Sequence, residues 1–456
     1  MIKKLLRNVA TALALAAAFT GTADALDLRP QIEPLAQPLT RDGAVVGLVI
    51  GVVKDGQTQI LAFGETAKDS GKAPDGKTVY EIGSATKAFT GVLLADAIQS
   101  GRMKLDDPVQ KYLPKQVKMP SVDGKTITLE HLATHTSGLP RLPNNFRPKD
   151  PTNPYADYTG KNLAEGLNKL KLERAPGEYE YSNLGMALLG QTIVLKSAKS
   201  YETLLKERIA GPLDMEDTSI KLNASQRQRL APPYNAKLEP DHNWDLPTLA
   251  GAGAIRSTVD DMLKFLQANL AEDDAPLTKT LQLARTKKHT MKDGLAIGLG
   301  WHLARDGVTW WHNGQTGGYA SWMSVTPKLG IGVVVLSNTA TDKITQLGEQ
   351  VVQTAAGVQV KLPVERKEMA VDPAVLEKYV GVYAIVPQFK LTVTLEDGQL
   401  MVQATDQPKF PVFAETPTEF FLKVVDAQLT FVPGDDGQAK ELILHQNGQD
   451  MTGKRE

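Results

Sequence analysis

Strand-like segments occur early in the chain and again late, and helical segments lie between them. Valine and isoleucine dominate Val45 to Val53, and after the turn at Lys54-Asp55-Gly56 an extended pattern resumes from Thr58 to Phe63, which predicts a β-hairpin. Strand patterns return in Val308 to His312, Tyr319 to Val325 and Ile331 to Leu336. We therefore expect an α/β (α+β) fold: one antiparallel sheet made from both ends and flanked by helices, with an inserted all-helical lobe.

The middle of the chain has helical patterns joined by irregular connections. The helical segments are Thr128 to Thr134, Leu163 to Leu170, Leu184 to Lys196 and Tyr201 to Ile209. A cleft between this lobe and the sheet is the natural place for a substrate.

The last 80 or so residues have a different character. Phe389, Leu391, Val393 and Leu395 alternate with polar residues, and Asp397-Gly398 then turns the chain, which predicts a small all-β meander or barrel. We expect a large first domain at residues 26–360, a linker at 361–371 and a C-terminal β domain at 372–456.

The N-terminus has the pattern of a signal peptide. Lys3, Lys4 and Arg7 precede an apolar run from Val9 to Phe19, and Ala23-Asp24-Ala25 gives the small-x-small pattern of a cleavage site. We expect residues 1–25 to be removed and the protein to be periplasmic or secreted, with an uncleaved anchor as the alternative. A formal net charge of −1 offers no field for nucleic acid or an anionic membrane as partners, and the zero cysteine count excludes thiolate chemistry. The oligomeric state is not indicated.

Ser84-Ala85-Thr86-Lys87 places a hydroxyl three residues before an amine where a helix should begin. On a helix these two side chains share one face, and the following apolar run from Ala88 to Ile98 predicts a buried helix. A buried lysine with a lowered pKa can take the proton of a serine nucleophile. The alternative is that Ser84 caps the helix and Lys87 is solvated.

A second polar motif is Tyr181-Ser182-Asn183, just before the helix from Leu184. In an extended segment Tyr181 and Asn183 project to the same side. A phenol beside a lysine can carry a proton, and a carboxamide can bind a substrate amide. The alternative is a helix N-cap with a packed tyrosine.

A third motif, His312-Asn313-Gly314-Gln315, lies in a polar, glycine-rich interruption between two strand patterns. It could be an edge strand whose backbone amides point into the cleft, with a protonated His312 binding a substrate carboxylate. The alternative is a plain hairpin turn.

The order of these three motifs resembles that of the penicillin-recognising serine hydrolases: class C β-lactamases, DD-peptidases and related esterases. The likeness spans about Leu28 to Ala355 and includes ITLEHLATHTSGL (127–139), GAGAIRSTVDDMLKFLQANL (251–270), GLGW (298–301) and TGGY (316–319). It implies a β-lactamase/transpeptidase-like fold and a serine hydrolase that uses no cofactor and no metal.

The resemblance also implies a role for each motif residue. Ser84 would be the nucleophile, with Lys87 and Tyr181 as the proton-handling pair. The backbone N–H groups of Ser84 and Gln315 would form the oxyanion hole. Asn183 would bind the substrate's amide side chain, and the segment His312, Asn313 and Gly314 would also bind substrate.

Two departures from the family pattern bear on the substrate. Class C β-lactamases usually have Lys-Thr-Gly where this chain has His312-Asn313-Gly314, and a histidine is mostly neutral at pH 7. In addition, Leu142 stands where class C enzymes often carry a glutamine. The first departure weakens the case for a β-lactamase proper, and the second weakens the case for a matching acylamide pocket.

We therefore expect an enzyme that acylates Ser84 with a D-Ala-type amide or a β-lactam and hydrolyses the resulting ester. A carboxylesterase, with Trp310-Trp311 as an apolar wall, and a penicillin-binding sensor that acylates without turnover are the alternatives. His131 and His135 are four residues apart, but no third ligand accompanies them, so a zinc site is not expected.

Overall fold

The structure, a computed structural model, describes residues 25–292, 294–360, 362, 366–423, 425, 427–446 and 449–456. The chain divides into two compact units, Met1–Leu362 and Pro363–Glu456, each with its own hydrophobic core. The expected signal peptide lies outside the described residues except for Ala25, and the expected linker is described only in part. Within the described residues no helix has the length and apolar character needed to cross a membrane.

The first unit is built on an eight-stranded antiparallel sheet in the order β2-β1-β10-β9-β8-β7-β6-β5. Its strands are β1 Gly47–Lys54, β2 Gln57–Gly64, β5 His289–Thr290, β6 Ala296–Ile297, β7 His302–Leu303, β8 Trp310–Gln315, β9 Ala320–Thr326 and β10 Ile331–Ser337. Strand β1 pairs with β2 on one side and with β10 on the other. The expected hairpin, and the sheet made from both ends of the region, are confirmed.

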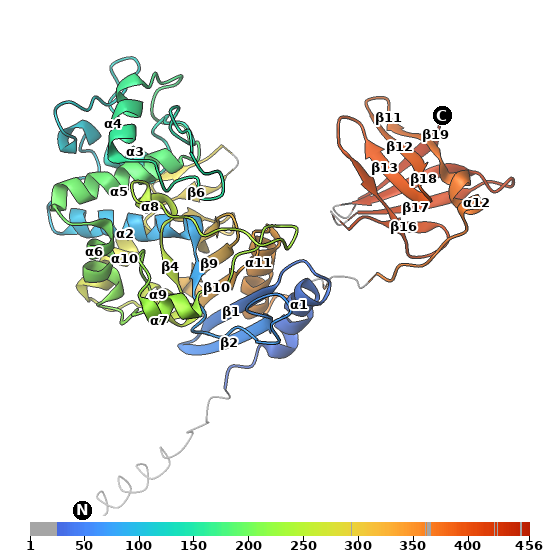
Figure 1. The fold of residues 1–456 in the computed structure, drawn as a ribbon, viewed down its shortest axis with the longest axis horizontal. Coiled ribbons are helices and arrows are strands. Elements are labelled where there is room, and N and C mark those ends of the chain that lie inside the picture. Colours follow the sequence, from blue (N-terminus) through green and yellow to red (C-terminus); the bar gives the residue numbers. More distant parts are fainter. Residues whose placement is uncertain are drawn as a thin grey trace, which may run out of the picture. The chain divides into compact units, whose positions relative to one another are not determined.

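Helices cover both faces of this sheet (Figure 1). Helices α1, Arg29–Arg41, and α11, Lys343–Ala355, pack on one face together with Leu48, Ile50 and Val52 of β1. Helix α9, Val259–Leu270, covers the other face, where Val49 and Val53 join a separate core. Because β1 is buried on both faces, its sequence is almost continuously apolar rather than alternating.

The helical lobe is confirmed with one local difference. Its helices are α2 Thr86–Gln99, α3 Leu129–Ala133, α4 Gly160–Lys169, α5 Asn183–Ser197, α6 Tyr201–Leu205, α7 Ala224–Arg229, α8 Ala250–Gly253 and α10 Pro276–Ala284. The helix expected to run to Ile209 changes after Leu205 into a π-helical turn, Lys206–Ala210. Gly211 permits this wider turn, since its N–H reaches the carbonyl of Lys206 at 2.8 Å, where a Cβ would clash.

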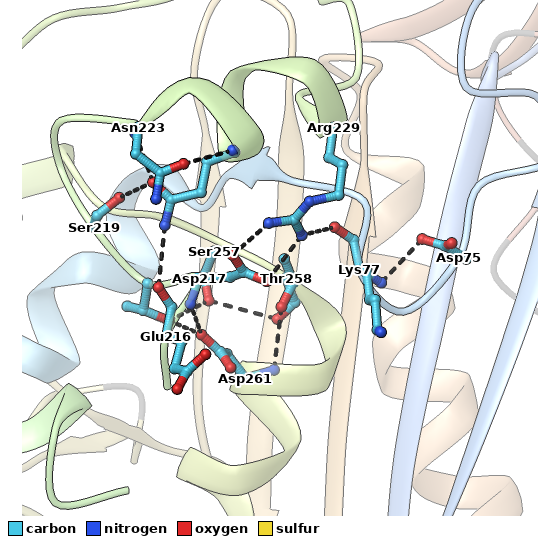
Figure 2. Close-up of polar contacts among 12 residues, drawn as sticks. Asp75, Lys77, Glu216, Asp217, Ser219, Asn223, Arg229, Ser257, Thr258 and Asp261 are labelled. Atoms are coloured by element: carbon cyan, nitrogen blue, oxygen red, sulfur yellow. Dashed lines mark hydrogen bonds and ion pairs between the residues drawn. The ribbon is translucent and has the colours of Figure 1, made fainter. Parts of the chain in front are cut away.

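A polar cluster, here called the bracing network, joins helix α7 to the start of α9 (Figure 2). Arg229 donates to both carboxylate oxygens of Asp217, at 2.8 and 2.5 Å, and to the backbone carbonyl of Lys77 at 2.7 Å. The Asp261 carboxylate accepts from the Asp217 N–H at 2.8 Å and from the Thr218 hydroxyl at 2.9 Å.

This network holds the chain that leads to Ser84. The Val79 N–H donates to the carbonyl of Arg229 at 2.9 Å, and strand β3, Tyr80–Glu81, pairs with β4, Arg256–Ser257. Strand β3 is followed directly by the turn that carries the serine. The bracing network therefore fixes the entry to that turn.

The second unit is a nine-stranded sheet in the order β14-β13-β12-β11-β19-β18-β17-β16-β15. Its strands are β11 Gly381–Val386, β12 Phe389–Glu396, β13 Gln399–Ala404, β14 Lys409–Pro411, β15 Phe413–Ala414, β16 Glu419–Phe421, β17 Ala427–Pro433, β18 Ala439–Gln446 and β19 Gln449–Arg455. The two edge strands, β14 and β15, are separated only by Val412, so the sheet curls into a nearly closed barrel. Its core includes Tyr379 stacked on Phe431, with ring centres 4.4 Å apart. The expected C-terminal β fold is confirmed.

Candidate active site

Ser84 lies in a short 3₁₀ turn, Gly83–Ala85, between strand β3 and helix α2. Its hydroxyl makes no capping bond to the helix. Instead it accepts from the amine of Lys87, with Nζ and Oγ 2.9 Å apart, and the same amine donates to the carbonyl of Ala252 at 2.7 Å. Lys87 is fully buried. The alternative of a capping serine and a solvated lysine is therefore wrong.

The surroundings of Lys87 disfavour its charged form. Burial lowers the pKa of Lys87 well below its usual value, and the positive charge of Arg141 lowers it further. No carboxylate of the described residues forms an ion pair with this amine. The geometry thus presents a serine hydroxyl with an amine whose pKa is lowered by burial.

Tyr181 completes the group from the helical lobe. The Lys87 Nζ lies 4.9 Å from the centre of the Tyr181 ring. Burial raises the pKa of Tyr181, and the neighbouring Ser84 side chain offsets only part of that rise. The phenol therefore keeps its proton near neutral pH. Ser84, Lys87 and Tyr181 are brought together as the sequence predicts.

The segment around Tyr181 is held by Ser182 and His135. Ser182 caps helix α5, since its hydroxyl accepts from the Gly185 N–H at 2.8 Å, and this leaves Asn183 as the first helical residue. The Ser182 N–H donates to Nδ1 of His135 at 3.1 Å, and the His135 ring packs on Tyr181 with centres 4.5 Å apart. The N-cap alternative is correct for Ser182. The side chain of Tyr181 nevertheless lies beside Lys87.

Strand β8 continues through the third motif to Gln315, so the motif lies in a strand and the alternative of a plain hairpin turn at Asn313-Gly314 is wrong. Pairing with β9, in which Asn313 lies opposite Trp322 and Gly314 opposite Ser321, keeps these polar residues in the sheet. On its other side β8 is paired by β7 only at Trp310 and Trp311. The end of β8 is therefore a free edge beside the turn of Ser84.

Two glycines allow this edge to touch the serine turn. Gly83 has φ +49, and a Cβ there would lie 2.7 Å from the Gln315 nitrogen. A Cβ on Gly314 would lie 2.0 Å from the carbonyl oxygen of Ile82 and 2.9 Å from the Ser84 nitrogen. The backbone nitrogens of Ser84 and Gln315 are therefore in neighbouring segments whose contact excludes larger residues.

Two of the predicted substrate contacts are not supported by the geometry. The side chain of Asn313 donates to Thr345 of helix α11 at 3.1 Å, on the opposite side of the sheet from the serine. His312 is buried, and burial, together with the charges of His302 and Lys87, lowers the pKa of His312 well below its usual value. A buried neutral imidazole does not supply the cation that was expected to bind a carboxylate.

Ser84, Asn183 and Gln315 line a pocket of about 340 Å³, a volume that includes the open solvent at its entrance. Tyr155, Trp244, Leu246 and Leu249 form its apolar wall. The amide oxygen of Asn183 has no partner among the described residues and is free to accept a hydrogen bond from a substrate. Trp310 and Trp311 do not line this cavity, and Trp311 packs instead on Trp322 with ring centres 5.0 Å apart.

Sequence reasoning missed three groups near the site. The Ala252 carbonyl, the His135 ring and the Arg141 guanidinium all lie against Lys87 or Tyr181. The signal was available, because these residues fall in or beside two segments that resemble the family, but nothing in their local pattern distinguishes them from packing residues. Within the described chain no group of three His, Cys, Asp or Glu residues could hold a metal ion, and His131 instead helps to cap helix α3.

Comparisons with known proteins agree with this geometry. A family model described as Beta-lactamase matches residues 32–356, and a model described as a domain of unknown function (DUF3471) matches residues 365–455. The D-alanyl-D-alanine-carboxypeptidase/endopeptidase AmpH of Escherichia coli strain K12 is 31% identical over 325 residues, which cover 67% of this chain and 82% of AmpH. A beta-lactamase of Pseudomonas fluorescens is 27% identical over 350 residues, covering 69% of this chain and 94% of that protein.

A solved structure gives the same result for the fold. The beta-lactamase/D-alanine carboxypeptidase from Yersinia pestis, complexed with citrate, matches with a TM-score of 0.64 and 28% sequence identity. The match covers 72% of this chain and 97% of that one. A match of this length corresponds to the first unit of the present chain.

Proposed function

Because the chain belongs to the beta-lactamase family of serine hydrolases, we propose that it is an exported enzyme that acylates Ser84 and then hydrolyses the ester. The proposed substrates are D-Ala-type amides and β-lactams. The observation that carries the proposal is the contact of a serine hydroxyl, a buried amine and a protonated phenol beside a cavity.

The proposed acylation uses each group once. Lys87, as the neutral amine, takes the proton of Ser84 while Oγ attacks the substrate carbonyl carbon. The N–H groups of Ser84 and Gln315 bind the oxyanion of the tetrahedral intermediate, which contributes on the order of 3–4 kcal/mol per donor. The C–N bond then breaks, and Tyr181 gives a proton to the departing nitrogen and regains one from Lys87. Water later attacks the ester and releases the acid.

The remaining parts of the proposal concern location and domains. We propose that residues 1–25 direct export to the periplasm or outside the cell and that the mature chain begins at Leu26. In the mature chain we propose a hydrolase domain at residues 26–360, a linker at 361–371 and an accessory β domain at 372–456. N-terminal sequencing of the protein recovered from a periplasmic fraction tests the export step, and a cytoplasmic protein that retains Met1 would refute it.

Intact-protein mass spectrometry after mixing with a penicillin tests the chemistry. We expect an adduct on Ser84 that disappears as product accumulates, together with release of D-Ala from an acyl-D-Ala-D-Ala peptide. Ser84→Ala should form no adduct, while Ser100→Ala, at the far end of the same helix, should react normally. An adduct that persists without turnover would instead identify a penicillin-binding sensor.

A carboxylesterase is the second candidate, and the apolar wall of the cavity favours it. Tyr155, Trp244 and Leu249 present a surface suited to an uncharged acyl group, and the buried His312 adds no cation. A short p-nitrophenyl ester, a chromogenic cephalosporin and a D-Ala-D-Ala peptide should be compared directly. Turnover of the ester alone would replace the amide assignment by this one.

A further inference from the structure

A substrate that carries a carboxylate needs a cation in or beside the cavity, and the two basic residues next to Ser84 do not provide it. Lys87 is fully buried, with its amine bonded to Ser84 and Ala252. His312 is buried, and that burial lowers its pKa well below the usual value. Any fixed positive charge available to a substrate must come from another element.

Arg141 lies on a loop that is anchored to both sides of Asn183. The carbonyl of Pro140 accepts from the Ser182 hydroxyl at 2.7 Å, and the carbonyl of Arg141 itself accepts from the Leu184 N–H at 3.1 Å. These bonds fix the backbone of the loop against the start of helix α5. The position of Arg141 relative to the cavity is therefore set by the motif that carries Tyr181.

The Arg141 side chain is exposed and lies over the Tyr181 ring. Its guanidinium carbon is 5.1 Å from the ring centre, a distance typical of cation–π contact, and the Lys87 Nζ is 4.9 Å from the same centre. The charge of Arg141 also acts on Tyr155, which belongs to the cavity wall. Arg141 itself does not line the cavity, but its guanidinium lies against Tyr181 and its loop is bonded to both neighbours of Asn183, which does.

This positive charge has no acidic partner among the described residues. The nearest acidic residues in the sequence of the Tyr181 segment are already paired, Glu178 with Lys292 at 2.9 Å and Glu180 with Arg174. An arginine that is held over an aromatic ring and has no counter-ion among the described residues has its planar N–H groups free for a carboxylate.

We propose that Arg141 binds a carboxylate of the substrate at the mouth of the cavity and so makes the enzyme select anionic substrates. The inference rests on the proposed function, because it takes Ser84 as the residue that is acylated. The carboxylate can belong to the acyl half of the substrate or to its leaving group. The chemistry of recognition is the same, and matched substrate pairs separate the two sources.

The test compares substrates that differ by a single carboxylate. For the leaving group the pair is an acyl-D-Ala-D-Ala peptide and its C-terminal amide, and for the acyl half it is mono-p-nitrophenyl glutarate and p-nitrophenyl butyrate. We expect Arg141→Gln to lower the anionic-to-neutral ratio of kcat/KM by about 10-fold or more in one pair, mainly through KM. Arg141→Lys should restore part of the ratio.

Two controls make the result specific to this guanidinium. Arg147→Gln removes an exposed arginine of the same loop region, whose guanidinium contacts only the carbonyls of Asn144 and Phe146 at 3.2 and 2.7 Å, and it should leave the ratio unchanged. Arginine stays charged throughout the accessible range, so the wild-type preference should be flat between about pH 6 and 9. A preference that disappears above pH 7 would point to a histidine and overturn the inference.

A binding arm keeps the inference separate from the proposed function. Glutarate and glutaramide are compared as competitors of Ser84 labelling by a fluorophosphonate, which requires no turnover. Stronger competition by glutarate that is lost in Arg141→Gln supports the inference, and equal competition overturns it. Failure of the proposed function has a different signature, namely wild-type protein that forms no β-lactam adduct and releases no D-Ala.

Discussion

The first unit contains the partly buried bracing network and a second polar cluster around Ser84, and the two differ in how completely their atoms are paired. In the bracing network, Arg229 bonds to the Asp217 carboxylate, and the Asp261 carboxylate accepts from the Asp217 N–H (Figure 2). Within the described chain, every buried side-chain nitrogen or oxygen of these three residues has a hydrogen-bond partner. Around Ser84 the buried atoms Oδ1 of Asn183 and Nε2 of His312 have no partner among the described residues.

This difference in hydrogen bonding distinguishes polar groups that stabilise the fold from polar groups that we propose take part in the reaction. A buried donor or acceptor without a partner costs about 1–3 kcal/mol, so a cluster of such atoms is not explained by stability. A paired network costs little and positions what is attached to it. Here the network fixes the strand before Ser84. The atoms of Asn183 and His312 that lack a hydrogen bond lie near the serine, while others, such as Nε of Arg208 and Oδ1 of Asn338, lie elsewhere in the first unit.

The strongest way to break this comparison is Ser84→Ala. If the cleft cluster exists for acyl transfer, kcat/KM for any accepted substrate should fall by at least about 10⁴-fold, because no other group replaces the nucleophile. The unfolding midpoint in urea should stay close to wild type, since Ser84 caps no helix. Activity that survives would mean that the cluster has been assigned to the wrong chemistry.

Lys87→Met tests the same difference, because it should lower activity without lowering stability. We expect a loss of about 10³-fold in kcat/KM, because the proposed base is gone. The free energy of unfolding should not fall and should rise by up to about 1–2 kcal/mol, since methionine removes the cost of a buried amine.

The pH dependence of that gain has a definite sign. Burial lowers the pKa of Lys87 in the folded state, so the unfolded chain binds one proton more at all pH values between the folded and unfolded pKa. The wild-type contribution therefore becomes less favourable as the pH falls through this window. Urea unfolding at pH 6 and pH 9 should show the larger gain for Lys87→Met at pH 6, and an equal gain would mean that Lys87 is charged in the fold.

Arg229→Leu makes the opposite change in the bracing network. Removing the guanidinium leaves Asp217 without its two-point partner and the Lys77 carbonyl without a donor. We expect a loss of about 1–2 kcal/mol in unfolding free energy for these partly buried bonds. In contrast to the cleft variants, kcat/KM per folded molecule at 20 °C should change little.

The control for this variant lies on the same helix. Arg227→Leu removes an exposed arginine whose guanidinium bonds to the carbonyl of Leu222 and to no carboxylate, so its effect should be smaller. If Arg229→Leu lowered kcat/KM as strongly as Lys87→Met, the distinction between groups that stabilise the fold and groups that take part in the reaction would be wrong.

The sequence predicts the three proposed catalytic side chains better than it predicts the groups that position them. Ser84, Lys87 and Tyr181 were predicted from motif spacing, because a helix turn and a short polar segment fix their local geometry. Asn313 was predicted to bind substrate, whereas its side chain donates to Thr345, because the alternation of β8 depends on a pairing with β9 that the motif does not reveal.

The groups that were missed depend on contacts far apart in the chain. Ala252 of helix α8 bonds to Lys87, and His135, which follows helix α3, bonds to Ser182 at the start of helix α5. The same holds for His312, whose neutral state follows from burial among His302 and other residues rather than from its own segment. The hairpin and the C-terminal strands were predictable because their alternation is local.

The smallest expected effect is a shift in pH profile from Arg141→Gln. The charge of Arg141 is the second cause, after burial, of the lowered pKa of Lys87. Removing it should raise that pKa, so the neutral amine forms only at higher pH. For a neutral ester, the acidic limb of kcat/KM should therefore move to higher pH, while the plateau above it is retained.

The neutral ester matters in this experiment, because it separates the action of Arg141 on Lys87 from any contact with a substrate carboxylate. Arg147→Gln, a change of the same charge farther along the loop, should leave the limb in place. A limb that stays fixed in Arg141→Gln, or moves to lower pH, would show that another group sets the base. Burial alone would then lower the pKa of Lys87, and Arg141 would affect catalysis only by binding the substrate.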